Sequence, residues 1–505
     1  MADLTPETRE EMLLDGQDLE PVTRKEQFIR KIYDDSQEIP EPVTREEWFL
    51  KKAGEGTSPV TIESLTATSN GEYSETGKAY SPVTVAVPLG EKTITANGVY
   101  NASDDGLAGY SKVTAGVVPI YGFHLNGGEG DPYHAITYIA DNADWSPAYM
   151  DYTNDKFEYG SWRDAWFIKK LKPCILNQDG TVRCYLNPDD YTKDLEGNTV
   201  AIDENLTGAN VMIEFPKIWM KIVPDAQDDT SADIYFSEKK QDDGYTDFPY
   251  IAMDGVTHKD HFYMPAFNGS VIDGVLRSIS GQTSTKCQSK DASEEIAAAQ
   301  LNGTGWWIEC AGQIMLINML LLLIGRNTDT QVTFGQGISG GSQTAFNNYS
   351  TGTLYNKGLF YGDDGTSAAV KVFGIENWWA LQWRRYSGDI LDNNVIKSKM
   401  CWGKSDGSTV DAYNLDGTGY VEIGTSPASN YLITQKVTPL GLFAKTTSSS
   451  SGIWKDYYYA DSSGVQFALR GGSSYDGSSA GAFFVYRNVG AGYRYGSVGA
   501  APSFV

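Results

Sequence analysis

The sequence has few of the residue types that metal, disulfide and redox sites require. Its 505 residues include five cysteines and four histidines. The cysteines are odd in number and form no CxxC pair, which disfavours both a zinc site and a disulfide framework. His258 and His261 have neither an HExxH helix nor a nearby cysteine, so they are interpreted as a loop pair. The sequence therefore predicts no metal ion and no cofactor.

Positive charge is scarce, and so are long apolar runs. The chain carries 40 Lys and Arg against 65 Asp and Glu, a formal net charge of -25. Nucleic acid and anionic membranes need a cationic footprint, so both are excluded as partners. The most apolar run, 314–324, is about half of the roughly 20 residues that a bilayer span requires, which predicts a buried helix. Residues 1–6 have no basic or apolar signal region, so we expect folding in a cytoplasm.

Catalytic motifs are also missing. The Gly-rich stretch 335–341 lacks the Lys-Ser/Thr pair of a phosphate loop. The Asp-Asp-Gly segments at 242–244 and 363–365 lack the alternating oxygen ligands and the Glu of a calcium loop. Carboxylate pairs for glycoside hydrolysis are plentiful in so acidic a chain, but nothing ranks one pair above the others. The sequence predicts that the protein is not an enzyme.

Aromatic residues and glycine, in contrast, are abundant. The chain has 31 Tyr, 19 Phe, 12 Trp and 53 Gly, and 41% of its residues are hydrophobic. This composition predicts substantial cores in a turn-rich architecture rather than a helical bundle. The length predicts two to four domains.

Residues 1–57 contain a threefold repeat. The segments 8–11, 23–26 and 44–47 each begin with Thr-Arg and end with Glu, the pattern of a capping box at a helix N-terminus. Helices this short are marginal in water and need a surface to pack on. Two interpretations stay open: a flexible tail, or a docking segment that becomes ordered against a partner.

Residues 58–119 contain a different, twofold repeat. Asn-Gly occurs at 70–71 and again at 97–98, each between alternating β-forming residues. This dipeptide is the strongest local signal of a hairpin. We therefore expect two small β units in tandem, acting as a spacer.

Residues 120–505 form the large region, in which short strand-like segments alternate with Gly, Asn and Asp turns. Helices are expected at 292–301 and 311–324. A hairpin is expected at Asp179-Gly180, and pairing across that turn sets Cys184 opposite Ile175 and leaves Cys174 diagonal to it. The sequence thus predicts free thiols at both cysteines.

Three segments of this region resemble proteins of bacteriophage tails. Residues 172–191 and 211–217 are similar to a segment common in phage tail and fibre proteins. Gly-Ile-Glu-Asn-Trp-Trp at 374–379 resembles an element of the formylglycine-generating-enzyme-type C-type lectin fold. The C-terminus, from Leu-Arg-Gly-Gly at 469–472 to 500, resembles the hypervariable repeat of proteins diversified by diversity-generating retroelements, such as phage major tropism determinants.

Composition agrees with the third resemblance. In such systems adenines of asparagine-type codons are randomised, which cannot generate Lys, Glu, Gln, Met or Trp. None of these five residue types occurs in 471–505, where the composition of the whole chain predicts on the order of six. An alternative is that a Gly-rich strand region lacks them by chance.

The resemblance implies a multidomain chain. Short N-terminal helices (1–57) and a small β-repeat module (58–119) would precede a large α+β C-type-lectin-like domain at 120–505, whose variable region is 470–505. The oxidase relatives of this fold need a cysteine pair in the C-terminal part, where this chain has only Cys401. Enzymatic activity is therefore not carried over with the fold.

The expected binding site lies in the variable region. Tyr offers a large contact area at low entropic cost, and Ser, Gly and Asn adapt by hydrogen bonding, as in antibodies. The residues expected to be scaffold are Arg470, Gly471, Gly472, Phe483, Gly499 and Phe504. The residues expected to bind ligand are Ser473, Tyr475, Asp476, Ser479, Tyr486, Arg487, Asn488, Val489, Tyr493, Arg494, Tyr495 and Ser497.

Together these features predict a receptor-binding protein of the phage tail, made in the host cytoplasm and carried on the virion. Its partners would be a bacterial surface receptor, either protein or glycan, and tail or baseplate proteins bound through 1–57. The resemblance favours a homotrimer. Two alternatives remain: a tail-associated depolymerase acting on surface glycan, and an inert baseplate or fibre component.

Overall fold

The structure is a computed structural model, and it divides the chain into two compact units, Met1–Val118 and Pro119–Val505. The predicted helices of 1–57 lie outside the described residues. The structure describes residues 98–100, 113–115, 118–283, 289–342, 345–401, 420–461 and 463–505.

In the first unit, two short strands are described. β1 (Gly98–Tyr100) pairs antiparallel with β2 (Val113–Ala115). Strand β1 begins at the glycine of the second Asn-Gly, and its partner β2 lies in the later part of the same repeat. The first copy of the repeat lies outside the described residues.

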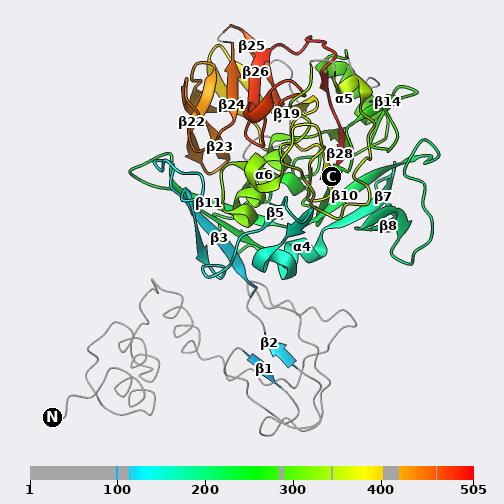
Figure 1. The fold of residues 1–505 in the computed structure, drawn as a ribbon, viewed down its shortest axis with the longest axis horizontal. Coiled ribbons are helices and arrows are strands. Elements are labelled where there is room, and N and C mark those ends of the chain that lie inside the picture. Colours follow the sequence, from blue (N-terminus) through cyan, green and yellow to red (C-terminus); the bar gives the residue numbers. More distant parts are fainter. Residues whose placement is uncertain are drawn as a thin grey trace, which may run out of the picture. The chain divides into compact units, whose positions relative to one another are not determined.

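The second unit contains a four-stranded and a seven-stranded sheet (Figure 1). The first has the order β11-β12-β3-β4, and the second has the order β16-β28-β13-β10-β7-β8-β9. The strands of the first are β3 (Ile120–Leu125), β4 (Ile136–Ala140), β11 (Trp219–Pro224) and β12 (Ala232–Ser237). Those of the second are β7 (Lys172–Asn177), β8 (Val182–Asn187), β9 (Asp190–Asp194), β10 (Ala209–Pro216), β13 (His261–Pro265), β16 (Trp306–Ile308) and β28 (Pro502–Phe504).

A nine-stranded sheet completes the unit, with the order β21-β20-β19-β25-β26-β24-β22-β23 and β27 paired to β19. It is built mostly from the C-terminal part of the chain. Its strands are β19 (Trp383–Asp392), β20 (Val395–Ser398), β21 (Val421–Thr425), β22 (Asn430–Thr438), β23 (Gly441–Ser448), β24 (Tyr457–Ala460), β25 (Val465–Arg470), β26 (Val485–Val489) and β27 (Val498–Gly499). Short two-stranded ladders pair β5 (Tyr149–Asp151) with β6 (Lys156–Glu158), β14 (Ser270–Ile272) with β15 (Val275–Arg277), and β17 (Lys371–Val372) with β18 (Ile375–Glu376).

The expectation of an α+β fold is wrong. In the part of the chain that the structure describes, strands account for 38% and helices for 13% of the residues. The reason is that the Gly- and Trp-rich segments form strands and irregular loops, so the helical content stays small. The α-helices are α4 (Trp166–Lys170), α5 (Ala292–Gln300), α6 (Ala311–Gly325) and α7 (Thr330–Phe334), and the 3-10 turns are η2 (Gly160–Asp164), η3 (Phe248–Tyr250), η5 (Ala345–Asn348) and η6 (Gly477–Ser479).

Two local predictions for the large region are confirmed. The two expected helices are α5 and α6, and each begins at the predicted residue. In the β7–β8 hairpin, Ile175 pairs with Cys184 and Cys174 pairs with Tyr185, and both thiols are free. The turn glycine adopts a φ of 83°, which is why Asp-Gly suits the position.

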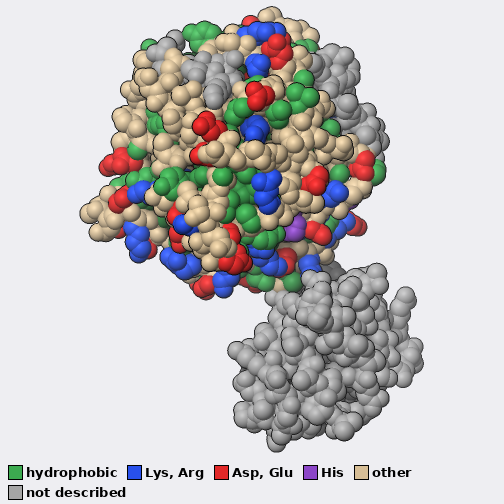
Figure 2. Space-filling view, turned by 90° about the vertical axis from the view of Figure 1, so that its right-hand side faces the viewer, with side chains coloured by type: hydrophobic (Ala, Val, Ile, Leu, Met, Phe, Trp, Pro, Cys, Tyr) green, Lys and Arg blue, Asp and Glu red, His purple; other side chains and the backbone are tan. Residues whose placement is uncertain are grey.

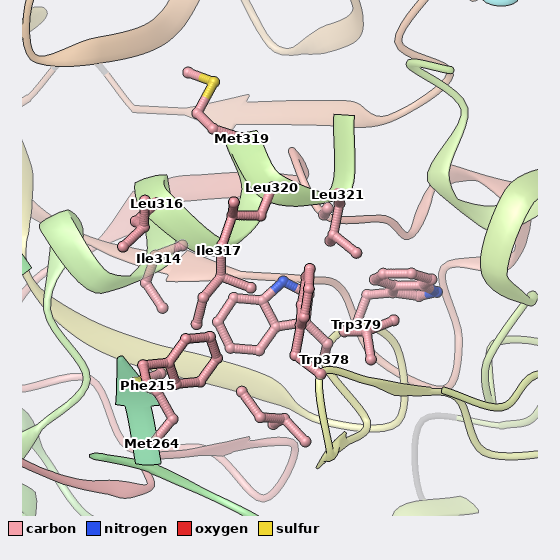
Figure 3. Close-up of a cluster of buried hydrophobic side chains, with 14 of the residues drawn as sticks. Phe215, Met264, Ile314, Leu316, Ile317, Met319, Leu320, Leu321, Trp378 and Trp379 are labelled. Atoms are coloured by element: carbon pink, nitrogen blue, oxygen red, sulfur yellow. The ribbon is translucent and has the colours of Figure 1, made fainter. Parts of the chain in front are cut away.

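Helix α6 lies at the centre of the core, between the nine-stranded sheet and β10 (Figure 1). Apart from Gln313 and Asn318 the helix is apolar on all sides, as expected for one that is covered on every face. In Figure 3, Ile317 of α6 lies against Trp378, and Phe215 of β10 lies below them, on the side of the seven-stranded sheet. None of the helices that the structure describes is long and apolar enough to cross a membrane.

Candidate functional site

The C-terminal segment 470–505 contains two glycines near its start that the fold requires. Gly471 and Gly472 follow β25 with φ values of 84° and 86°. A Cβ on Gly471 would lie 3.1 Å from the Cα of Trp379, and one on Gly472 would lie 2.9 Å from the Cβ of Ala480. The Leu-Arg-Gly-Gly segment is therefore restricted by both backbone conformation and space.

Arg470 anchors the same segment. Its Nη2 lies 2.8 Å from Glu309 Oε1, and its Nη1 donates to the carbonyl oxygen of Trp378 at 2.6 Å. The guanidinium carbon lies 3.6 Å from the centroid of the Trp378 ring. Arg384 Nη1 donates to the same carboxylate at 3.0 Å, so the fully buried Glu309 lies between two guanidinium groups.

Trp378 also connects the C-terminal segment to the central helix. Its indole nitrogen donates to Asn318 Oδ1 at 2.9 Å. The amide of Asn318 donates to the carbonyl oxygen of Ala482 at 2.7 Å. The Glu-Asn-Trp-Trp element and the polar residue within α6 therefore position the loop before β26.

Two further buried ion pairs hold β19. Arg487 on β26 donates to Asp389 through Nε at 2.9 Å and through Nη2 at 2.5 Å. Arg385 Nε lies 2.5 Å from Glu295 of α5, and both side chains are fully buried. Burial raises the pKa of Glu295 to about 7, although Arg385 opposes the shift. We call Arg384, Arg385, Arg470 and Arg487 with their carboxylates Glu295, Glu309 and Asp389 the arginine framework.

The structure corrects the expectation for four predicted contact residues. Arg487 belongs to the arginine framework and is 2% exposed, so it faces the interior and not a ligand. Val489 packs in the core, the Ser473 hydroxyl donates to Asp476 Oδ2 at 2.7 Å, and Ser497 lies beside β19. These three side chains are also buried.

The other predicted contact residues reach the surface to differing degrees. Tyr475 and Tyr495 are 63% and 46% exposed, and Asn488 and Arg494 are exposed as well. Asp476, Ser479, Tyr486 and Tyr493 are half-buried. Arg494 is held at the start of α5 by Asp291 at 2.6 Å and Glu294 at 3.0 Å, so its charge is already paired.

Sequence reasoning missed a row of tyrosines next to these residues. Tyr431 of β22, Tyr457 and Tyr459 of β24 and Tyr486 of β26 are half-buried neighbours on adjacent strands. Their successive ring centroids are 5.0, 4.6 and 5.0 Å apart. The signal in the sequence was the spacing of Tyr457 and Tyr459, since residues two apart in a strand share a face.

Two further tyrosines among the predicted contact residues form a second ring pair. The rings of Tyr493 and Tyr495 are 6.0 Å apart and nearly parallel, at 19°. Burial raises the pKa of Tyr493, and Tyr486 and Tyr495 raise it further because they lie nearby. We call Tyr431, Tyr457, Tyr459, Tyr486, Tyr493 and Tyr495 the tyrosine surface. Burial raises the pKa of Tyr459, and Tyr457 and Asp476, the chain neighbour of Tyr475, raise it further.

The described residues offer little for metal or charge-driven chemistry. They contain no group of three or more His, Cys, Asp or Glu side chains that could hold a metal ion. His258 binds Asp247 at 2.7 Å, whereas His261 lies 3.7 Å from Glu214, so the two histidines face different carboxylates. On the face in Figure 2, basic and acidic side chains are interspersed and form no large patch of one sign.

No protein-family model and no curated protein matches this chain. The arrangement of its side chains therefore carries the functional argument.

Proposed function

We propose that the chain is a phage tail receptor-binding protein whose C-terminal surface contacts a ligand on the bacterial cell. The observation that carries the proposal is the tyrosine surface, which shares β26 with the buried arginine framework. Residues 471–505 supply both the exposed tyrosines and, through Arg487, part of the framework. A surface that tolerates exchange of its outer residues needs such a fixed support below it.

The chemistry of this surface is that of an antibody paratope. Tyrosine provides a large contact area with few rotatable bonds, and serine and asparagine provide adaptable hydrogen bonds. The rings are tilted against each other by 71°, 40° and 55° along the row. Because the single cation among the exposed contact residues, Arg494, is already paired, recognition would rely on shape and hydrogen bonding rather than on charge.

The remaining parts of the proposal concern the virion. Residues 1–57 would attach the protein to tail or baseplate proteins, residues 58–119 would act as a spacer, and the assembled form would be a homotrimer. Deleting 1–57 should leave receptor binding intact and abolish incorporation into particles. Normal incorporation of the deletion variant would disprove this assignment.

Binding of the labelled full chain to a panel of bacterial strains tests the proposal. Tyr475→Ala should weaken binding to any strain that the wild type binds. Tyr149→Ala is the matched control, because Tyr149 is 49% exposed and belongs to β5, outside the tyrosine surface. Equal binding by both variants, or release of reducing sugar from the cells by the wild type, would contradict a purely adhesive C-terminal surface.

A further inference from the structure

A cavity lies beneath the tyrosine surface. Its volume is about 40 Å³, and its lining includes Arg470, Arg487, Asp389 and Gln435. Strands β25 and β26 each contribute an arginine to it, and α6 closes one side. A water molecule needs roughly 10–15 Å³ by the same measure, so the cavity has room for a small ion or a few waters.

The polar atoms that are left over around this cavity are donors. Arg487 Nη1, Arg470 Nε and Gln435 Nε2 are buried and have no hydrogen-bond partner. The carboxylate in the lining is already used: Asp389 Oδ1 accepts from Arg487, and Oδ2 accepts from Arg487 and from Tyr386. A buried donor without a partner costs on the order of 1–3 kcal/mol, more if it is charged. The lining therefore fits a guest that accepts hydrogen bonds.

The charges around the cavity do not balance. Arg487 pairs with Asp389, which leaves no net charge. Arg470 and Arg384, however, share the single carboxylate of Glu309. Arg384 Nη2 donates to two neutral oxygens, Oδ1 of Asn268 and the backbone carbonyl oxygen of Glu376.

One excess positive charge thus remains on a group of five buried side chains, which are Arg384, Arg470, Arg487, Glu309 and Asp389. An uncompensated charge in the interior is expensive. Burial lowers the pKa of Arg470 to about 10, and Arg384 adds to the lowering. A guanidinium nevertheless stays protonated at neutral pH.

We propose that this cavity binds a small monovalent inorganic anion, with chloride as the physiological occupant, between Arg470, Arg487 and Gln435. One negative charge neutralises the excess, and a halide accepts hydrogen bonds from several directions. The bound anion joins β25 to β26 from below and so steadies the strand that carries Tyr486. This role is independent of what the tyrosine surface binds.

Thermal melting of the full chain at matched ionic strength tests the proposal. In sodium chloride or bromide, Tm should exceed that in sodium gluconate by on the order of 2 °C and should rise with halide concentration until the site saturates. Gln435→Leu should fold and lose most of this increment, because it removes one donor and no charge. Arg494→Ala, which changes a surface ion pair, should keep the increment.

Crystals grown in bromide supply the decisive second measurement. The account predicts an anomalous bromide peak in the cavity, within hydrogen-bond distance of Arg487 Nη1. Bromide peaks on the surface only, or melting curves that do not distinguish chloride from gluconate, would overturn the proposal and leave water as the occupant.

Discussion

The arginine framework and the tyrosine surface belong to the same nine-stranded sheet and share strand β26, but they follow opposite physical rules. In the framework, guanidinium and carboxylate groups are buried, and each depends on a specific partner. In the surface, rings are half-exposed and contact one another on one side and core aromatic residues such as Phe484 on the other. Removal of one framework residue leaves an unpaired charge in the interior, whereas a surface ring can be exchanged at small cost to folding. The framework can therefore hold β26 in place while the residues beside it vary.

The largest expected effect is at Glu309. Glu309→Gln removes the carboxylate that Arg384 and Arg470 share and leaves two guanidinium groups unpaired, so we expect a loss of about 3–5 kcal/mol in the free energy of unfolding. Arg494→Ala breaks exposed ion pairs and should cost at most about 1 kcal/mol. Denaturant unfolding measures both. Similar losses in the two variants would erase the distinction between framework and surface.

A second contrast compares two aromatic residues of the C-terminal segment 470–505. Phe483 is buried, with its ring 4.7 Å from that of Trp454, so Phe483→Ala should cost about 3–5 kcal/mol of stability. Tyr475→Ala should stay within about ±0.5 kcal/mol, because the side chain is 63% exposed. Thermal melts of the two variants side by side check this. Early melting of the Tyr475 variant would show that this loop supports the fold.

The sequence predicted several elements well, because local signals decide them. The starts of α5 and α6 follow from capping and apolar runs. The register of the β7–β8 hairpin, with Cys184 opposite Ile175, follows from the Asp-Gly turn. The error in the fold class came from the resemblance, since nothing local in the sequence demanded an α+β architecture. Strand pairings such as β24 with β26 join distant segments, and no local pattern specifies them.

The candidate site was predicted as a region but not residue by residue. Residues 486–489 were expected to be contacts throughout, yet in a strand successive side chains point to opposite faces. The structure accordingly buries Arg487 and Val489 and leaves Tyr486 and Asn488 on the outer side. The carboxylate partner of Arg487 is 98 residues away in the chain, so no local pattern could identify it.

A third prediction concerns binding. Among Tyr486→Ala, Tyr493→Ala and Tyr495→Ala, at least one should weaken attachment to a bound bacterial strain by more than about 1 kcal/mol, because a minority of interface residues carries most of the energy and tyrosine is over-represented among them. Titration of labelled protein against cells measures the change, with Tyr149→Ala as the control. If all three variants bind like the wild type, the receptor site lies elsewhere on the molecule.

A fourth prediction is a pH dependence at Asp456. Burial raises the pKa of this carboxyl well above its usual range, and Asp329 raises it further. Since the folded pKa lies above the unfolded one, the contribution of Asp456 to stability is complete below about pH 4 and is lost as the pH rises through the folded value. Asp456→Asn should therefore be more stable than the wild type at neutral pH. Denaturant unfolding at several pH values measures this difference in stability, which should vanish near pH 4. A difference that does not change with pH would contradict the raised pKa of Asp456.

The most direct test of the central claim compares two adjacent residues of β26, Tyr486 and Arg487. Thermal melting and cell binding would be measured for Tyr486→Ala and Arg487→Ala in the full chain. The account predicts that the Tyr486 variant melts close to the wild type and binds weakly, whereas the Arg487 variant loses several kcal/mol of stability because Asp389 is left unpaired. The reverse pattern, with Tyr486→Ala unfolding early and Arg487→Ala stable but unable to bind, would contradict the division into a framework and a surface.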